Sequence, residues 1–340
     1  MPAYLARRLA LTILVLWGLT LATFVITHLV PGDPAALYLG PKPTQEQIEA
    51  VNRKFGFDQP LPVQYVRYMQ GVMSGDLGLS LRTKRPVTSE LGARFAATFE
   101  LTTLGMALAL AVGLPIGVAS ARRRGGAVDR LSQVVALSGV AMPAFFMGML
   151  LQLLFHGRLN WLPLQGRLAK EVMAHSPVQS LTGLYLIDTL LTGNWPAFQS
   201  TAAHIVLPAL TIAFTSVAVV TRMARSAMLE VLSQDYVRTA WAYGLPERLV
   251  YYKYALKPAL VTVVTVVGLA YGYLLGGSFL VESIFDWPGL GQYAVLSILY
   301  NDYPGVMGVT VLYAVSFILV NLAVDLIYHA LDPRLKEPGT

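Results

Sequence analysis

The fold is decided by stretches such as ALVTVVTVVGLAYGYLLGGSFLV, which occupies Ala259–Val281 and contains no charged residue. A transmembrane helix needs about 20 predominantly apolar residues to cross a hydrocarbon layer about 30 Å thick. Five further stretches of this kind lie at Leu9–Val30, Thr98–Ala121, Leu131–Phe155, Thr201–Thr221 and Val306–Tyr328. The sequence therefore predicts an all-α, polytopic membrane protein with six transmembrane helices.

The composition supports this class. The chain has 340 residues, of which 55% are hydrophobic and 13% charged, with a formal net charge of +6. Soluble domains usually carry about 25% charged residues, so the chain lacks the polar surface that a soluble fold of this length needs. It has no cysteine, which excludes thiol catalysis, cysteine-ligated zinc and a disulfide framework. We expect membrane lipid around the spans and no nucleic-acid partner.

Basic residues predict the orientation of the spans. With the N-terminus in the cytoplasm, the cytoplasmic segments carry Arg7, Arg8, Arg122, Arg123, Arg124, Arg130, Arg222, Arg225, Arg238, Arg248, Lys253, Lys257, Arg334 and Lys336. Residues 158–200 contain only Arg158, Arg167 and Lys170, and residues 282–305 contain no lysine or arginine. Because cytoplasmic loops of membrane proteins are enriched in these residues, we predict a cytoplasmic-membrane protein with both termini in the cytoplasm.

Two apolar runs could change the number of spans. Leu9–Val30 follows two arginines, as a signal peptide does, but its apolar run exceeds the 7–15 residues of a cleaved signal. We therefore expect a retained helix. Leu181–Leu191 is too short to span and contains Asp188, so we expect an interfacial or re-entrant segment.

Catalytic and cofactor-binding patterns are missing from the sequence. It has no H-E-x-x-H and no G-x-x-x-x-G-K-[ST] phosphate loop, and its five histidines lie far apart at span ends or in loops, where water or backbone partners are expected. We predict no enzyme activity and no catalytic, cofactor-binding or metal-binding residue. Glu100 and Asp325 lie near span ends and are interpreted as interfacial or paired structural charges. An ion-coupled carrier usually has an ionisable group near the membrane midplane. The middles of the predicted spans contain no such group, so this class remains an alternative for which the sequence shows no coupling residue.

Glycines supply a packing signal. Gly268, Gly272 and Gly276 recur every four residues and share one helix face, and Gly113 and Gly117 flank Pro115. Small residues at this spacing let helices approach closely in lipid. Helix packing is one interpretation of the pattern, and a translocation path lined by these helices is the other.

The most informative loop, Ala224–Leu260, follows the fourth span. Leu229, Leu232, Tyr236, Ala240 and Tyr243 are spaced by three or four residues and predict one amphipathic helix. Gly244 followed by Pro246 is typical of a left-handed helix end, and a second helix is expected to start at Pro246 and Glu247. Such a helix either lies on the membrane surface or inserts into a groove of a partner protein.

This loop also carries a family resemblance. DYVRTAWAYGL (Asp235–Leu245), with YALKPAL (Tyr254–Leu260), resembles the cytoplasmic loop of ATP-binding-cassette importer permeases, in particular the dipeptide, oligopeptide and nickel branch. Further similar stretches are VPGDPAALYLG (Val30–Gly40), FGFDQPLPVQYVRYMQGVMSGDLGLSL (Phe55–Leu81), GSFLVESIFDWPGLGQ (Gly277–Gln292), NDYPGVMG (Asn301–Gly308) and NLAVDLIYHALDPRLK (Asn321–Lys336). The segment around Leu181–Asp188 is most similar to the B-type subunit of dipeptide permeases.

The resemblance implies a type I importer permease fold. It also implies a second homologous permease, two ATPase subunits that hold ATP and Mg, and an external solute-binding protein, with dipeptides or related small peptides as substrates. Oligopeptides, haem, glutathione and nickel chelates remain alternatives, as does a non-transporting membrane scaffold. The implied ATPase-coupling positions are Asp235, Tyr236, Arg238, Thr239, Ala240 and Gly244. Arg238 stands where the general pattern has Glu, and Trp241 and Tyr243 stand where basic residues are frequent in that branch.

The remaining expectations concern the external parts and the domain division. Residues 31–97 are expected to form a small external cap. The aromatic residues of the last external loop are expected to anchor at the membrane interface by default. Within the resemblance, Phe285, Trp287 and Tyr303 are candidates for an outer gate or a binding-protein contact. We divide the chain into a first span with its external segment (1–97), a five-helix permease core (98–330) with the coupling loop 224–258, and a cytoplasmic tail (331–340).

Overall fold

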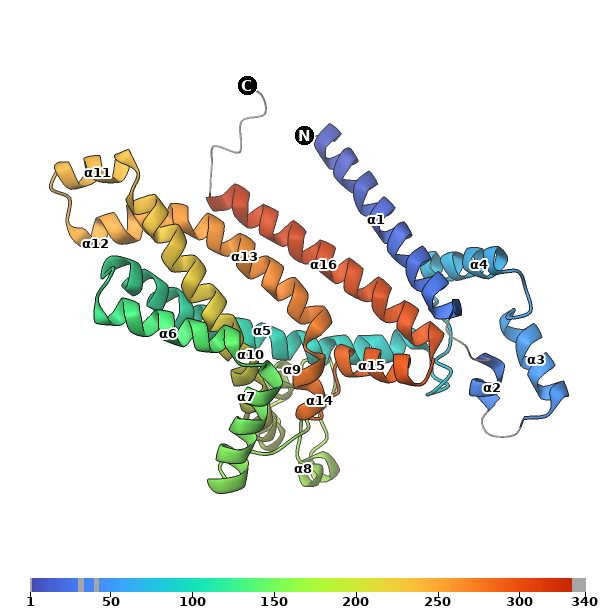
Figure 1. Ribbon diagram of the computed structural model, residues 1–340. Helices are drawn as coiled ribbons and strands as arrows, with labels where there is room; N and C mark the ends of the chain where they lie inside the picture. The colour runs from blue at the N-terminus through green and yellow to red at the C-terminus, as the bar shows by residue number, and fades with distance from the viewer. Residues whose placement is uncertain (1, 30–33, 40–42, 332–340) are drawn as a thin grey trace. The chain divides into compact units, whose positions relative to one another are not determined.

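The computed structural model describes residues 2–29, 34–39 and 43–331 of the chain (Figure 1). Over these residues the regular secondary structure is helical, apart from one isolated antiparallel β-bridge between Leu79 and Pro86. The predicted all-α fold class is confirmed. The chain divides into two compact units. Unit 1 holds the described residues of Met1–Thr98 and Pro288–Ile318, and unit 2 holds those of Phe99–Trp287 and Leu319–Thr340.

Unit 1 combines the first apolar helix with short helices and with parts of two long ones. Its helices are α1 (Pro2–Leu29), α2 (Pro34–Leu39), α3 (Gln45–Phe55), α4 (Leu61–Ser74), the first part of α5 (Val87–Arg122), α15 (Leu290–Leu299) and the first part of α16 (Tyr303–Leu331). A capping box between Thr44 and Gln47 starts α3, and Gly56 ends it at a φ of +73°. The carboxylate of Asp302 accepts hydrogen bonds from the Ser80 hydroxyl and the Leu81 N–H, which fixes the turn between the two bridge residues.

Unit 2 contains the rest of the chain. Its helices are the second part of α5, α6 (Ala127–Ala141), α7 (Ala144–Leu151), the π-helix η1 (Gln152–Arg158), α8 (Lys170–His175), α9 (Tyr185–Leu191), α10 (Trp195–Leu232), α11 (Asp235–Ala242), α12 (Glu247–Leu249), the π-helix η2 (Val250–Ala255), α13 (Leu256–Gly277), α14 (Phe279–Ile284) and the second part of α16. One apolar cluster is rich in alanine and consists of Val118, Ala121, Ala224, Ala227, Met228, Ala255, Ala259 and Val263. These small side chains allow α5, α10 and α13 to pack closely.

Five of the six predicted membrane spans are single helices, and the sixth is a bent pair of helices. Among the described residues, five helices are long and apolar enough to cross a membrane, at Leu11–Leu29, Val87–Arg122, Trp195–Leu232, Glu247–Gly276 and Tyr303–Tyr328. The sixth segment is a pair of helices, Ala127–Ala141 and Ala144–Arg158, bent by 101°. The prediction of one continuous helix over Leu131–Phe155 is therefore wrong.

Proline explains the break in this segment. Pro143 lacks an N–H, and its ring disfavours the α conformation for the residue before it. Met142 accordingly adopts φ −89° and ψ 123°, and its N–H still bonds the Ser138 carbonyl, so α6 ends in an ordered way. The segment between α7 and α10 is also ordered, and α9 is a helix of seven residues. At seven residues α9 is shorter than a membrane-spanning helix, and the interfacial or re-entrant location of Leu181–Leu191 stays a prediction.

Glycine mediates the packing of α5 on α10, as its spacing predicts. A Cβ on Gly117 would lie 2.6 Å from the Ala224 Cβ and 2.8 Å from the Thr221 carbonyl oxygen. A Cβ on Gly113 would lie 3.0 Å from the Val220 Cβ, and the Gly113 carbonyl accepts a hydrogen bond from the Thr221 hydroxyl at 3.2 Å. The close approach predicted for this pair is confirmed, and α5 continues as a helix through Pro115.

Candidate functional site: the loop between α10 and α13

The loop predicted to carry the function folds as a short helix between two turns. The 38-residue α10 ends at Leu232, and α11 begins at Asp235, after a turn at Ser233 and Gln234. In Figure 1, α11 and α12 lie together beyond the ends of α10 and α13. The sequence predicted a single helix with one apolar stripe from Leu229 to Tyr243. The turn breaks that helix, so this part of the prediction is wrong.

Gly244 ends α11 as predicted. Its φ is +71°, its N–H bonds the Trp241 carbonyl at 2.9 Å, and the Leu245 N–H bonds the Ala240 carbonyl at 3.3 Å. These two bonds form a Schellman motif, in which a glycine in the left-handed conformation satisfies the last carbonyls of a helix. Pro246 then precedes Glu247, the first residue of α12. The tight turn fixes the direction in which α11 points.

The buried face of α11 differs from the predicted one. Val237 and Ala240 are buried and form a cluster with Val250, against which Leu245 and the end of α10 pack. Tyr236 is 47% exposed and Tyr243 is 82% exposed, although the spacing placed both with Ala240 on one apolar stripe. The cluster is built from small and branched aliphatic side chains, and the aromatic rings face outward.

The outward face of α11 is polar and aromatic. The side chains of Asp235 and Arg238 are 95% and 71% exposed, and their ion pair is long, at 3.4 Å. Such an exposed pair contributes little to stability. The Thr239 hydroxyl donates to the Asp235 carbonyl at 2.9 Å, and the Tyr236 hydroxyl donates to the Tyr254 carbonyl at 3.4 Å. Of the six predicted coupling residues, Asp235, Tyr236 and Arg238 lie on this accessible face, whereas Ala240 belongs to the buried cluster.

Contacts of Arg122 with Glu247 and Tyr251 hold the start of α12 and η2, which form the base of the loop. Arg122 at the end of α5 donates two hydrogen bonds to the Glu247 carboxylate, at 2.9 and 2.8 Å. The Arg122 guanidinium also lies 5.7 Å from the centroid of the Tyr251 ring, and that ring meets Trp241 edge to face at 6.0 Å. The loop therefore joins α5, α11 and the start of the fifth apolar helix.

A buried charge cluster near this base was missed by the sequence analysis. Asp129 is 2% exposed and pairs with Arg225 at 2.6 Å. Its carboxylate also accepts from the Ser120 hydroxyl, the Gly125 N–H at 2.8 Å and the Gln133 amide at 3.0 Å. An aspartate in the first turn of a helix beside several arginines is a recognisable signal. The partner on α10 is 96 residues away, and helical periodicity does not identify such a partner.

The histidines behave as predicted where the structure describes their side chains. The Nδ1 atoms of His28, His156, His175 and His204 each lie 2.6–3.0 Å from a backbone carbonyl oxygen. The side chain of His329 lies outside the described set. Within the described residues, no group of three or more His, Asp or Glu is placed to hold a metal ion.

The glycines of the fifth span occupy different environments. A Cβ on Gly268 would overlap the Val324 side chain of α16, which indicates close helix packing in unit 2. Gly272 is buried and Gly276 is exposed. The shared helix face therefore has a packing role at Gly268.

The aromatic residues of the last predicted external loop lie mainly inside the protein. Phe285 and Trp287 in unit 2 are 1% and 0% exposed, and Tyr293 and Tyr303 in unit 1 are also buried. The default expectation of membrane-interface anchoring is wrong for these four side chains. Tyr300, at 58% exposure, remains accessible.

A second buried ion pair packs close to Trp287. Arg167 pairs with Glu100 at 2.6 Å, and its guanidinium lies 3.7 Å from the Tyr185 ring centroid and 5.4 Å from that of Trp287. The Glu100 carboxylate also accepts from the Leu186 N–H at 2.7 Å. The interpretation of Glu100 as a paired structural charge is confirmed.

The apolar helices and the bent pair define a polytopic integral membrane protein. The chain belongs to the family described as "Binding-protein-dependent transport system inner membrane component", which matches residues 113–337. Its residues 1–102 match a second family model, which describes the N-terminal part of the membrane component of binding-protein-dependent transport systems. It is thus a permease subunit of a binding-protein-dependent ABC importer, a transport component and not an enzyme. Family membership decides against the ion-coupled carrier and the scaffold.

Curated relatives match nearly the whole chain. It is 45% identical to the probable D,D-dipeptide transport system permease protein DdpB of Escherichia coli K12, over 96% of this chain and 95% of the relative. It is 43% identical to the dipeptide permease DppB of Alkalihalophilus pseudofirmus (99% and 100% covered) and 40% identical to the glutathione permease GsiC of Pectobacterium atrosepticum (98% of each).

A solved structure supports the fold. An inward-facing structure of the MetNI methionine ABC transporter matches with a TM-score of 0.52 and 18% identity, over 71% of this chain and 96% of that chain. This likeness confirms the type I importer permease fold.

Proposed function

We propose that this chain, paired with a second homologous permease, forms the path by which dipeptides cross the cytoplasmic membrane. Two ATPase subunits bind ATP with Mg and supply the energy, and an external solute-binding protein delivers the substrate. Support comes from the family description and from the relatives, several of which are named dipeptide permeases. The glutathione relative keeps that tripeptide as a second candidate substrate.

The observation that carries the energy-coupling role is the two-sided construction of α11. Val237, Ala240 and the Gly244 turn fix the helix from behind, while Asp235, Tyr236 and Arg238 face outward. A rigid helix with accessible aromatic and charged side chains suits insertion into a groove of a partner. We infer that α11 docks into a cleft of an ATPase subunit.

Replacement of Tyr236 by alanine tests the docking role. Truncation of an aromatic hot spot costs about 2 kcal/mol or more of binding free energy, roughly thirtyfold in affinity. Tyr236→Ala should therefore reduce co-purification of the ATPases and ATP-driven uptake together, while membrane insertion stays normal. Tyr300→Ala is the matched control, because Tyr300 is similarly exposed but belongs to the last predicted external loop. Wild-type ATPase recovery and uptake in Tyr236→Ala would defeat the docking role.

The proposed orientation has both termini in the cytoplasm, with the loop between α10 and α13 on the same side. The chain has no cysteine, so single cysteines report their position cleanly. A cysteine at Ser176 should react with a membrane-impermeant maleimide in spheroplasts, and one at Ser233 should react only after lysis. The opposite labelling pattern would overturn this orientation.

Two further roles are part of the proposal. The face of α13 that bears Gly268, Gly272 and Gly276 lies along or beside the translocation path. The buried aromatics Phe285, Trp287 and Tyr303 belong to the outer gate. For these three, contact with the solute-binding protein would require a conformation in which their side chains become accessible.

A further inference from the structure

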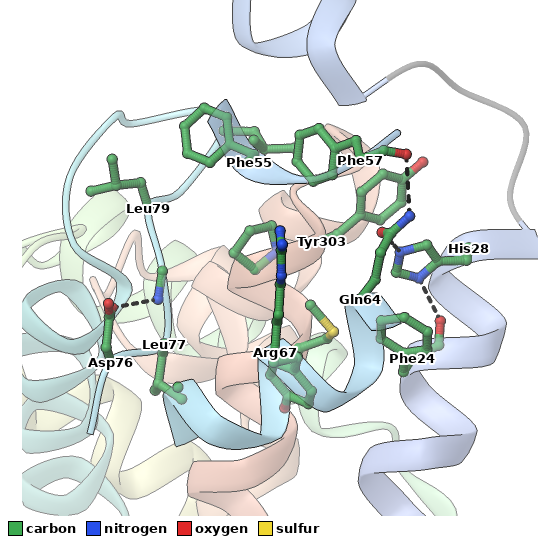
Figure 2. A pocket seen from close by; sticks show the side chains of 16 residues that line it. Phe24, His28, Phe55, Phe57, Gln64, Arg67, Asp76, Leu77, Leu79 and Tyr303 are labelled. Carbon is green, nitrogen blue, oxygen red and sulfur yellow. Dashed lines mark hydrogen bonds between the residues drawn. The ribbon is translucent and has the colours of Figure 1, made fainter. Parts of the chain in front are cut away.

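Unit 1 contains a pocket in which Tyr303 is the one lining residue that the proposal above also uses (Figure 2). It has a volume of about 240 Å³ and lies among α1, the end of α3, α4, the turn after α4 and the start of α16. Its apolar walls combine aliphatic side chains with the aromatic rings of Phe24, Phe55, Phe57, Tyr68 and Tyr303. A concave apolar site with a few polar groups is the usual form of a small-molecule site.

Arg67 of α4 supplies a positive charge to this pocket. Figure 2 shows its side chain extending toward the rings of Phe55 and Phe57. In the part of the chain that the structure describes, its guanidinium makes no ion pair or hydrogen bond. A Cβ on Gly56 would overlap the Nη1 atom of Arg67, so this glycine leaves room for the guanidinium between the two aromatic residues. The Arg67 guanidinium thus lines the pocket without an anionic partner among the described residues.

Asp76 supplies a negative charge on another wall. One carboxylate oxygen accepts the Gly78 N–H at 2.9 Å, which holds the side chain in place. Figure 2 shows Asp76 and His28 at opposite sides of the pocket, with Arg67 between them. The second carboxylate oxygen of Asp76 has no hydrogen-bond partner among the described residues. The pocket therefore presents one cation and one carboxylate around an aromatic interior.

The aromatic wall is fixed by a polar network that leaves Arg67 out. The Gln64 amide donates to the Gln59 carbonyl at 2.8 Å and to the Phe57 carbonyl at 3.2 Å, and its oxygen lies 3.3 Å from the His28 Nε2. The His28 ring packs on Phe24 in a tilted arrangement, with centroids 4.0 Å apart, and stacks on Tyr303, with centroids 5.8 Å apart. The pocket wall is held in place without help from either charge.

We propose that this pocket binds a short zwitterionic peptide with an apolar side chain, its C-terminal carboxylate on Arg67 and its N-terminal ammonium on Asp76. The inference rests on the proposed function only in taking peptides as the substrate class. A guanidinium forms paired hydrogen bonds with a carboxylate, and the aromatic interior covers the side chain. Because Arg67 is exposed, solvent screens the charge contact, so we expect weak binding that is sensitive to both peptide termini.

The experiment uses the full chain in lipid nanodiscs without its partners, with L-alanyl-L-phenylalanine as the probe and equilibrium dialysis as the measurement. Arg67→Gln should weaken binding about three- to tenfold, whereas Arg67→Lys should retain part of it. Asp76→Asn keeps the hydrogen bond from Gly78 and should also weaken binding. Arg53→Gln and Asp58→Asn are the controls, because both residues are exposed and neither lines the pocket.

Peptides with one blocked terminus identify the contacts in a double-mutant cycle. The C-terminal amide of the probe should bind the wild type more weakly, and Arg67→Gln should add no further loss. The N-acetyl probe should show the same relation to Asp76→Asn. Equal affinity of the wild type and Arg67→Gln for the unmodified probe, or of the wild type for the probe and its amide, would overturn the proposal.

A separate uptake assay distinguishes this inference from the proposed function. If the assembled transporter imports the probe with ATP but the nanodisc protein does not bind it, the pocket proposal fails and the transport function stands. If the protein binds the probe with the expected charge dependence but the assembled transporter never imports it, the dipeptide assignment fails and the pocket stands.

Discussion

Helices α9 and α11 lie in the same unit and have nearly the same length, but opposite kinds of contact hold them in place. The fully buried Asp188 carboxylate of α9 accepts bonds from the N–H groups of Leu181, Thr182 and Gly183 at 2.9–3.2 Å and from the Thr182 hydroxyl at 2.7 Å. By contrast, α11 is held by aliphatic contacts around Val237, and its charges point outward.

The difference shows how to separate structural from recognition residues in this chain. A buried carboxylate that accepts several hydrogen bonds, as Asp188 of α9 does, specifies a single local conformation. Exposed charges and rings on a helix that apolar contacts already fix, as on α11, remain accessible to another protein. Changes around α9 should therefore lower the stability of the chain, and changes on the outer face of α11 should lower partner binding.

The largest expected effect is at Arg167, which pairs with Glu100 beside α9. Removal of one partner of a buried ion pair leaves the other charge uncompensated, and this costs about 3–5 kcal/mol. Arg167→Ala should therefore greatly lower the thermal unfolding midpoint in detergent, as followed by intrinsic fluorescence.

Two further variants sharpen this prediction. Arg158→Ala, which changes an exposed arginine of the same loop, should leave the midpoint nearly unchanged. The double change Glu100→Gln with Arg167→Met should recover part of the loss, because it removes both charges. A midpoint of Arg167→Ala equal to that of the wild type would contradict the structural role assigned to the pair.

A smaller effect is expected from substitution of the glycines that follow α9 and α11. Gly193 after α9 and Gly244 after α11 have φ values of +66° and +71°, and no atom lies close enough to either to obstruct a side chain. A β-branched residue in this conformation costs on the order of 1–3 kcal/mol. Gly193→Val and Gly244→Val should each raise amide hydrogen exchange in the helix that precedes the glycine.

Only one of these changes should alter coupling. Gly244→Val should also lower substrate-stimulated ATP hydrolysis and uptake, because it displaces α11. Gly193→Val should leave ATPase association at the wild-type level. If both variants lose ATPase association equally, the strain acts on the whole chain and the contrast between α9 and α11 is wrong.

Features of the fold that local interactions determine were predictable from the sequence. The apolar helices follow from uninterrupted apolar stretches, and the end of α11 follows from Gly244 and Pro246, because a left-handed residue followed by proline cannot continue a helix. The break at Pro143 was missed because Leu131–Phe155 was judged by its length and apolar character. The restriction that proline imposes on the preceding residue is also local, and it could have been applied there.

Contacts between residues that are distant along the chain were not predictable from the sequence. Asp129 and Arg225 are 96 residues apart, and Glu100 and Arg167 are 67 residues apart, so neither pair has a periodic signature. The stripe predicted through Tyr236 and Tyr243 failed for another reason. A turn at Ser233 and Gln234 resets the helical phase, after which Val237 and Ala240 face inward and both tyrosines face outward.

The smallest effect in the comparison is a pH dependence at Asp188. Burial would raise the pKa of this carboxyl, but the hydrogen bonds from Thr182, Gly183 and Leu181 outweigh it and hold the pKa below its usual value. A lowered pKa in the folded state stabilises the fold above the unfolded-state value of about 4, and this contribution is lost as the pH falls through the folded-state pKa. Asp188→Asn should therefore lower stability by about 1 kcal/mol at pH 7, and the difference from the wild type should shrink below about pH 4. Thermal midpoints of the wild type and Asp188→Asn, measured at pH 7 and below about pH 4, test this. Asp235→Asn on α11 is the control, because its side chain is exposed and the substitution should leave the midpoint unchanged. A difference between Asp188→Asn and the wild type that stays constant across this pH range would show that the ionised carboxylate does not hold the turn before α9.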